Sequence, residues 1–137
     1  MRWQRGEFEI DTDPSRIDVG IVHEYLERSY WAAGIARERV ERSLSHSLCF
    51  GLYAGAEQIG FARVVSDRTT FAWIGDVFVL EPWRGRGLGV WLMQTITAHP
   101  QLQALRRWML ATRDAHGLYE KVGFTRLDDP ASYMLRR

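Results

Sequence analysis

The sequence has little cysteine, little net charge and no long apolar run. Its one cysteine, Cys49, excludes an internal disulfide framework and fits a reducing compartment. No apolar run approaches the roughly 18 residues that a membrane-spanning helix needs, and Met1–Glu7 lacks the apolar stretch of a secretory signal. The formal net charge is +1, and no long basic run indicates nucleic acid as a partner. We therefore expect a soluble, cytoplasmic protein without membrane association.

The histidines are scattered along the chain. His23, His46 and His99 lie too far apart in the sequence to indicate a metal site, and no metal is expected. The chain has 137 residues, which is the length of one domain. A chain of this length buries roughly two-thirds of its unfolded surface, enough for a core without disulfides or metals.

The most informative stretch runs from Asp76 to Thr97, where a strand pattern passes through a glycine-rich turn into a helix pattern. Val77–Leu80 is a short apolar run typical of a strand. Pro82 ends this predicted strand, because proline cannot donate a hydrogen bond to a strand ladder. From Leu88 onward, apolar residues recur at helical spacing. A strand, a turn and a helix are therefore predicted in this order.

The glycine-rich turn has the properties of an anion site. The first turn of a helix leaves backbone N–H groups without partners and carries partial positive charge. Gly85, Gly87 and Gly89 have no Cβ, so an anion can approach the main chain, and Arg84 and Arg86 add cationic reach. We therefore predict a phosphate or pyrophosphate site.

Two known nucleotide loops do not match this turn. No segment has the Walker spacing of a glycine, four residues and Gly-Lys-Ser/Thr. The spacing Gly-x-Gly-x-Gly also differs from the dinucleotide-binding loop, and the next acidic residue, Asp114, lies too far along the chain. A loop that only turns a corner is the alternative.

The remaining pattern predicts a mixed α/β domain over residues 1–137, with flanking helices and a central, mainly antiparallel sheet of about seven strands. Strands are expected at 7–11, 48–54, 58–66, 71–80, 108–112, 124–127 and 132–136. Helices are expected after a cap at Asp18, at 35–45, from Leu88 to about His99, and from a cap at Asp114 to Gly123. Gly75 suggests a β-bulge or a close approach of another backbone, and the strand at 108–112 is expected to run parallel to the strand before the glycine loop.

Two segments carry a family resemblance. Arg84-Gly85-Arg86-Gly87-Leu88-Gly89 resembles the Arg/Gln-x-x-Gly-x-Gly/Ala signature of the GNAT family of acyl-CoA N-acyltransferases. Leu118-Tyr119-Glu120-Lys121-Val122-Gly123-Phe124 resembles the family's later Leu-Tyr-x-x-x-Gly-Phe segment. The segments have the family's order and a plausible separation. The resemblance implies a GNAT sheet that splays into a V where acyl-CoA lies.

The resemblance also implies which residues hold acetyl-CoA as co-substrate. The pyrophosphate would lie on the amides after Arg84, and the pantetheine arm would pair with the preceding strand through main-chain hydrogen bonds, like an added strand. The expected residues are Val77, Phe78, Val79, Arg84, Gly85, Arg86, Gly87, Leu88, Gly89 and Val90.

Four residues are candidates for the chemistry and the acceptor. Tyr119 stands where the family's general acid stands, with core packing as the alternative. Asp76 is the expected base or amine anchor, with a satisfied carboxylate in a bulge as the alternative; some members have an acidic pair here, whereas Gly75 precedes Asp76. Tyr30 and Trp31 are expected to form an aromatic wall for the acceptor, or to pack between two helices.

His116 is open between a role at the site and simple exposure in the first turn of its helix. The predicted function is transfer of an acetyl group from acetyl-CoA to a primary amine of a small molecule or peptide by direct attack. The alternatives are a non-catalytic acyl-CoA-binding module, or an acetyltransferase for protein N-termini, lysines or aminoacyl-tRNA. Homodimers are common in the family, and a homodimer is an open expectation here.

Overall fold

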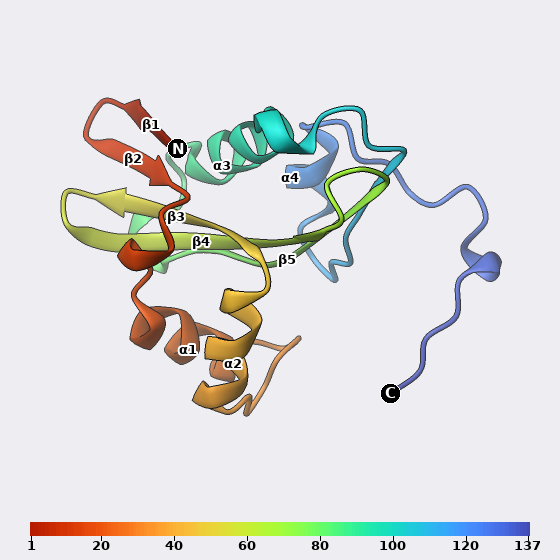
Figure 1. The fold of residues 1–137 in the computed structure, drawn as a ribbon, viewed down its shortest axis with the longest axis horizontal. Helices are drawn as coiled ribbons and strands as arrows, with labels where there is room; N and C mark the ends of the chain where they lie inside the picture. The colour runs from red at the N-terminus through yellow and green to blue at the C-terminus, as the bar shows by residue number, and fades with distance from the viewer.

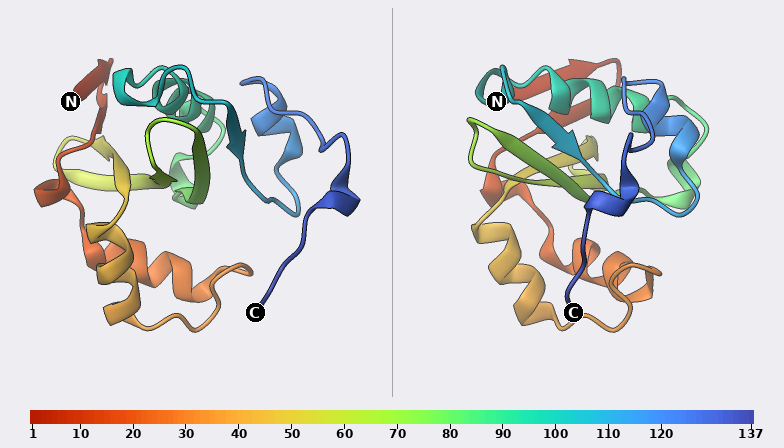
Figure 2. Two further views of the ribbon diagram at one scale, coloured as in Figure 1. Left: turned by 45° about the vertical axis from the view of Figure 1, so that its right-hand side comes forward. Right: turned by 90° about the vertical axis from the view of Figure 1, so that its right-hand side faces the viewer.

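Six strands form one mixed sheet with helices on both of its faces (Figures 1 and 2). The computed structural model describes all residues, 1–137. The strands are β1 (Arg2–Arg5), β2 (Phe8–Asp11), β3 (Leu48–Ala54), β4 (Glu57–Ser66), β5 (Phe71–Val79) and β6 (Arg107–Met109). The α-helices are α1 (Val19–Arg28), α2 (Arg37–Ser45), α3 (Leu88–Thr97) and α4 (His116–Glu120). None of the helices has both the length and the apolar character needed to cross a bilayer.

The strands lie in the sheet in chain order, from β1 to β6. The pairings from β1 to β5 are antiparallel, and β5 pairs with β6 in parallel. A parallel pair needs a crossover connection, which α3 supplies here. The predicted mixed, mainly antiparallel sheet is therefore confirmed.

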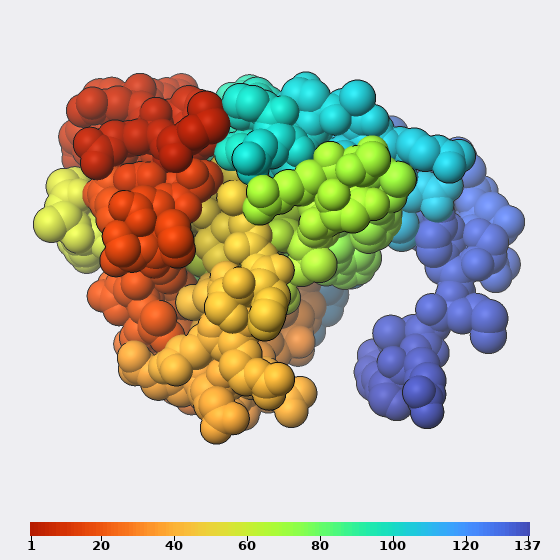
Figure 3. All heavy atoms as spheres, in the orientation of Figure 1, coloured from red at the N-terminus to blue at the C-terminus, as the bar shows by residue number.

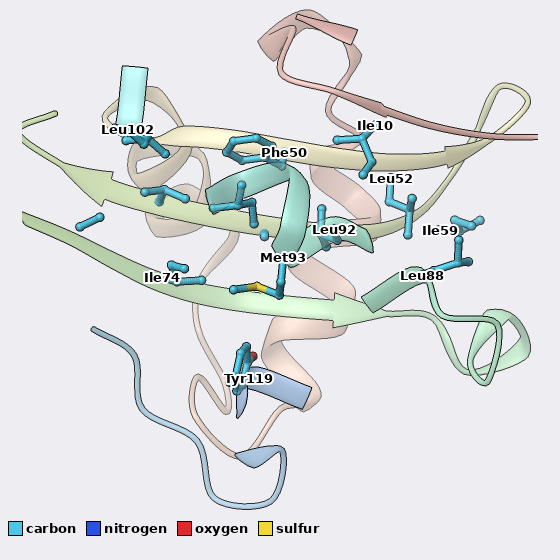
Figure 4. Close-up of a cluster of buried hydrophobic side chains, with 14 residues drawn as sticks. Ile10, Phe50, Leu52, Ile59, Ile74, Leu88, Leu92, Met93, Leu102 and Tyr119 are labelled. Atoms are coloured by element: carbon cyan, nitrogen blue, oxygen red, sulfur yellow. The ribbon is translucent and has the colours of Figure 1, made fainter. Parts of the chain in front are cut away.

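The sheet divides the interior into two cores because side chains alternate between its faces. On one face, Leu88, Leu92 and Met93 of α3 pack into the larger core (Figure 4). On the other face, the smaller core contains Val22 and Leu26 of α1, Val40 of α2, and three sheet residues, Cys49, Phe61 and Phe78. Helix α3 is thus held on one face of the sheet, and α1 and α2 are held on the other face.

Local signals placed most helix ends correctly. The Asp18 side chain accepts a hydrogen bond from the amide of Ile21 at 3.1 Å, which confirms the predicted cap of α1. The predicted cap at Asp114 is wrong. Helix α4 begins after Ala115, whose amide donates to the Thr112 hydroxyl at 3.0 Å.

Two strand predictions fail at the chain ends. The final strand pair at 124–127 and 132–136 is absent. The amide of Phe124 donates to the Tyr119 carbonyl at 3.1 Å and its ring packs on the larger core, whereas every residue from Thr125 to Arg137 is exposed. Strand β1 was not predicted; it pairs with β2 across a turn in which Gly6 has φ 60°. The sheet therefore has six strands in place of about seven.

Candidate functional site

A cleft of ≈ 1570 Å³ opens where β5 and β6 separate. The two strands pair only from Phe71 to Trp73 on β5, whereas β5 continues to Val79. Residues 73–79 line the cleft, together with Ala111–Ala115 from the loop after β6. The V-shaped opening implied by the resemblance therefore arises because β6 pairs only with the beginning of β5 and the rest of β5 has no strand on that side.

A β-bulge directs Asp76 toward the cleft. Phe61 pairs with Phe78 and Arg63 pairs with Gly75, so Ala62 on β4 faces two residues of β5, Asp76 and Val77. Asp76 has φ 56°, in the left-handed region that non-glycine residues seldom adopt. The bulge predicted from Gly75 is confirmed, and it re-aims the side chain that follows that glycine.

Both carboxylate oxygens of Asp76 accept hydrogen bonds from the protein. Arg63 Nε donates to Oδ2 at 2.8 Å, and Trp31 Nε1 donates to Oδ1 at 2.9 Å. The Asp76 side chain is only 12% exposed. Each carboxylate oxygen has two lone pairs, so Asp76 can still accept from a ligand. Arg63 was not among the expected site residues, because only the sheet register brings it opposite the bulge.

The glycine-rich turn leaves a run of amides unpaired. None of the amides from Gly85 to Val90 donates a hydrogen bond within the protein. Gly85 and Gly87 have φ 79° and 76°, and Gly87 is the N-cap of α3. A Cβ added at either glycine would meet nothing within 4 Å, so the space above the turn is open. These amides therefore form a cradle suited to the oxygens of a diphosphate.

The two arginines of the turn differ in placement. Arg84 lines the cleft, where its Nε donates to the Val79 carbonyl at 2.9 Å and its Nη2 donates to the Tyr25 hydroxyl at 2.9 Å. Arg86 is outside the cleft lining, with its guanidinium 5.1 Å from the centre of the Trp83 ring. Arg84 is thus the cation that ties the glycine turn to β5 and α1.

Tyr119 of α4 is buried and lines the same cleft. Burial raises the pKa of its hydroxyl to about 12, with smaller contributions from Tyr30 and Asp114. The hydroxyl therefore keeps its proton throughout the physiological range. Leu118, the preceding residue, lies 3.5 Å from the position of a Cβ added to Gly89, so α4 packs closely on the first turn of α3.

An aromatic segment from α1 to the following loop closes the other side of the cleft. Tyr25 stacks on Phe78 at a centroid distance of 4.1 Å. Tyr30 accepts a hydrogen bond from the amide of Arg113 at 2.9 Å, and the Arg113 guanidinium lies 4.0 Å from the centre of the Tyr30 ring. Tyr30 and Trp31 remain 44% and 41% exposed, which favours a wall of the cleft over helix packing.

The other reactive side chains lie elsewhere. His116 begins α4 but is not part of the cleft lining. Burial raises the pKa of the Cys49 thiol to about 11, as fits a small side chain of the core. No group of three or more His, Cys, Asp or Glu side chains could hold a metal ion.

This geometry agrees with a family model. Residues 45–126 match the model of the acetyltransferase (GNAT) domain, a span that contains β3 to α4 and the whole glycine turn. The chain belongs to the GNAT acetyltransferase family. The matched span covers the bulge, the amide cradle and Tyr119, whereas Tyr25, Tyr30 and Trp31 of the cleft wall lie before it.

Relatives support the assignment over most of the chain. A candidate acetyltransferase of Gibberella zeae is 30% identical over 142 residues, covering 88% of this chain and 80% of that protein. The crystal structure of a candidate GNAT acetyltransferase from Xanthomonas campestris pv. campestris is 49% identical with a TM-score of 0.92, covering 95% of this chain and 92% of that chain. Membership of the GNAT family therefore indicates that the general reaction of this domain is acetyl transfer.

A more distant structure shows the fold alone. A candidate acetyltransferase from Clostridium acetobutylicum, solved with acetyl-CoA, is 13% identical with a TM-score of 0.68 and covers 100% of this chain and 96% of that chain. The α/β architecture of this GNAT domain is therefore shared by proteins whose sequences differ greatly.

Proposed function

We propose that this GNAT domain is an N-acetyltransferase that moves the acetyl group of acetyl-CoA directly to a primary amine of a small molecule or peptide. The observation that carries the proposal is the run of unpaired amides at 85–90, which opens into the same cleft as Asp76 and Tyr119. The presence of acetyl-CoA in the Clostridium acetobutylicum structure of the same fold supports this choice of donor. A cytoplasmic location fits the single free thiol of Cys49.

The donor would be held by main-chain groups. The amides of the glycine turn suit its diphosphate, and the edge of β5 at Val77–Val79 suits the amides of its pantetheine arm, because β5 has no strand partner on that side beyond Trp73. Acetyl-CoA supplies the activated acetyl group as a thioester. The Arg84 side chain, which occupies the Val79 carbonyl, must give way where the arm pairs with that carbonyl.

The amine would be held at Asp76. A lysine-like amine has a pKa of ~10.4, so only about one molecule in 10³ is neutral at pH 7. The Asp76 carboxylate, oriented by Arg63 and Trp31, attracts the ammonium form and takes up its proton directly or through water. Tyr30 and Trp31 would form a wall beside the bound amine, because both line the cleft and the Trp31 indole contacts Asp76.

The proton for the leaving sulfur would come from Tyr119. Its raised pKa of about 12 keeps the hydroxyl protonated at neutral pH, and Tyr119 lines the same cleft as the glycine turn and Asp76, which supports this role. A CoA thiol has a pKa of about 8.5, so the sulfur gains from a donor when it departs. Asp76 would thus act as the general base and Tyr119 as the general acid of the same acetyl transfer.

A thiol-release screen tests the proposal. Acetyl-CoA is offered with small amines, amino acids, aminoglycosides, peptides with free N-termini or lysines, and aminoacyl-tRNA. Release of free CoA that requires both the enzyme and one amine class is the expected result, and acetylated product is confirmed by mass spectrometry. Tight binding of acetyl-CoA without release for any acceptor would favour an acyl-CoA-binding module, and absence of binding would overturn both.

A further inference from the structure

The lining of the cleft is more positive than the chain as a whole. It has five arginine side chains but only three carboxylates, in a chain whose formal net charge is +1. The carboxylates are those of Asp76, Glu81 and Asp114, and the arginines are Arg28, Arg39, Arg63, Arg84 and Arg113. Arg63 is paired with Asp76, and Arg84 ties the glycine turn to β5 and α1. The excess of positive charge is therefore left on the other three arginines.

None of these three arginines forms an ion pair within the protein. Arg28 is engaged by its own helix, since its Nε donates to the Glu24 carbonyl at 3.2 Å. Arg39 and Arg113 thus remain as the cations of the cleft that lack a partner. A guanidinium presents five N–H donors in a planar fork, which fits the oxygens of a carboxylate or a phosphate.

Arg113 is held close to the amine anchor by an aromatic pair. Its guanidinium lies 4.0 Å from the centre of the Tyr30 ring, and its amide donates to the hydroxyl of the same tyrosine at 2.9 Å. The rings of Tyr30 and Trp31 have centroids 5.1 Å apart, and the Trp31 indole donates to Asp76. A guanidinium that packs on an aromatic ring can still donate from its N–H groups. Arg113 is thus linked to Asp76 through two side chains.

Arg39 reaches the same side of the cleft from α2. It lies one helical turn before Ser43, and both residues line the cleft. The Ser43 carbonyl accepts a hydrogen bond from the Ser47 hydroxyl at 2.6 Å, and that hydroxyl accepts one from Arg63 at 3.1 Å. Arg63 in turn donates to Asp76. Two unpaired cations from different elements are therefore linked to the amine anchor.

This side of the cleft is open to solvent. Arg39 and Arg113 are exposed, and Figure 3 shows open space between the region of α1 and α2 (orange to yellow) and the segment near the C-terminus (blue). The donor diphosphate is already matched by the unpaired amides of the glycine turn. The two free arginines are therefore available to the acceptor.

We propose that the acceptor is an amine that also carries an anionic group, a carboxylate or a phosphate, and that Arg39 and Arg113 bind this group while Asp76 holds the amine. The inference rests on the proposed transfer of acetyl to an amine at Asp76. A purely cationic amine enters a cleft with an excess of its own charge, whereas an amine with an anion matches both Asp76 and the arginines. Charge-assisted hydrogen bonds to the anion also orient the amine.

Matched pairs of amines test the inference through the release of free CoA from acetyl-CoA. Free amino acids, β-alanine and dipeptides are each compared with their carboxamides, and phosphoethanolamine is compared with ethanolamine. We expect kcat/KM to be at least about 10-fold higher for the anionic member, as for charge-assisted hydrogen bonds, and the advantage to shrink as salt is added. The pair with the larger ratio distinguishes a carboxylate from a phosphate.

The double variant R39M/R113M removes the two cations, and R42M/R106M is the matched control. Arg42 lies on α2 and Arg106 precedes β6, and both are exposed and outside the cleft lining. We expect KM for the anionic amine to rise by about 10-fold or more in R39M/R113M with little change in kcat, and both values to stay normal in the control. Unchanged affinity for acetyl-CoA shows that the variant is folded. If R39M/R113M does not fold, Arg39→Met alone is measured in the same way.

The outcomes separate this inference from the proposed function. Equal kcat/KM for both members of every pair would refute recognition of an anion and leave the acetyl transfer in place. A preference that persists without the two arginines, or that falls equally in R42M/R106M, would refute their role. No release of CoA with any amine would overturn the proposed function and the inference with it.

Discussion

The indole of Trp31 donates a hydrogen bond to Asp76 across 45 positions of sequence, at 2.9 Å. This bond joins the loop after α1 to the bulge of β5, and Arg63 holds the other oxygen of the same carboxylate from β4. Three elements thus meet at the Asp76 side chain. The backbone of Asp76 is in the left-handed region, with φ 56°. The orientation of Asp76 in the cleft is therefore fixed before any substrate arrives.

Asp76→Asn should impair the amine half of the reaction. Asparagine keeps the shape and one carbonyl acceptor but removes the negative charge that attracts the ammonium form. We expect kcat/KM for the amine to fall by about 10²-fold, within the range of acid–base catalysis, with an unchanged affinity for acetyl-CoA. Steady-state kinetics with both substrates varied gives these values. An equal loss for both substrates would assign Asp76 a structural role.

Arg63→Met should destabilise the fold, because it leaves the largely buried Asp76 carboxylate without its cationic partner. We expect the free energy of unfolding to fall by about 1–3 kcal/mol, as for a buried polar group that loses its partner. Arg37→Met is the matched control. Its ion pair with Glu41 has side chains that are 56% and 52% exposed, and its loss should cost less than about 1 kcal/mol. Urea unfolding of the three proteins makes the comparison.

Tyr119→Phe should lower turnover by about 10²-fold while leaving the affinity for acetyl-CoA unchanged, because the variant keeps the ring and loses only the proton donor. Tyr53→Phe removes the hydroxyl of another buried tyrosine, one that lies outside the cleft and donates to the Arg16 carbonyl. That control should retain normal turnover. Wild-type turnover in Tyr119→Phe would exclude the hydroxyl from the mechanism.

The same tyrosine should make stability depend on alkaline pH. Burial raises the pKa of Tyr119 from 10.0 to about 12, so the folded state holds the proton more tightly than the unfolded chain. The resulting stability is complete below pH 10 and is lost as the pH rises through 12, by up to about 3 kcal/mol. Urea midpoints at about pH 9 and about pH 12 should therefore differ less in Tyr119→Phe than in the wild type. An identical difference would contradict the burial of the hydroxyl.

Gly87→Ala should weaken acetyl-CoA binding beyond its effect on folding. Gly87 has φ 76°, so alanine there strains the backbone and places a methyl group over the amide cradle. Gly55→Ala imposes a similar strain at φ 60° in the turn between β3 and β4, away from the cleft. Both variants should lose about 1–2 kcal/mol of stability, and calorimetry should show weaker binding in Gly87→Ala alone. Equal affinities of Gly87→Ala and Gly55→Ala for acetyl-CoA would show that the diphosphate does not bind at this turn.

Local patterns predicted the elements whose signals lie within a few residues. The change from strand to helix spacing around the glycine turn located β5 and α3, and the cap at Asp18 located the start of α1. The strand signal at 132–136 was equally local, yet the structure has no strand there, because the exposed segment does not pair with either edge of the sheet. Local propensity thus failed where pairing depends on a partner.

The site divides in the same way. The sequence by itself determined that bare glycines precede a helix, that Tyr119 follows at the family's spacing and that Asp76 comes next to a bulge-forming glycine. Only the tertiary structure decided that Arg63 and Trp31 would hold Asp76, and that Arg84 would link Val79 to Tyr25. These contacts join residues that are far apart in the sequence. They depend on the register of the strands and on the packing of α1 against the sheet, which local sequence patterns do not specify.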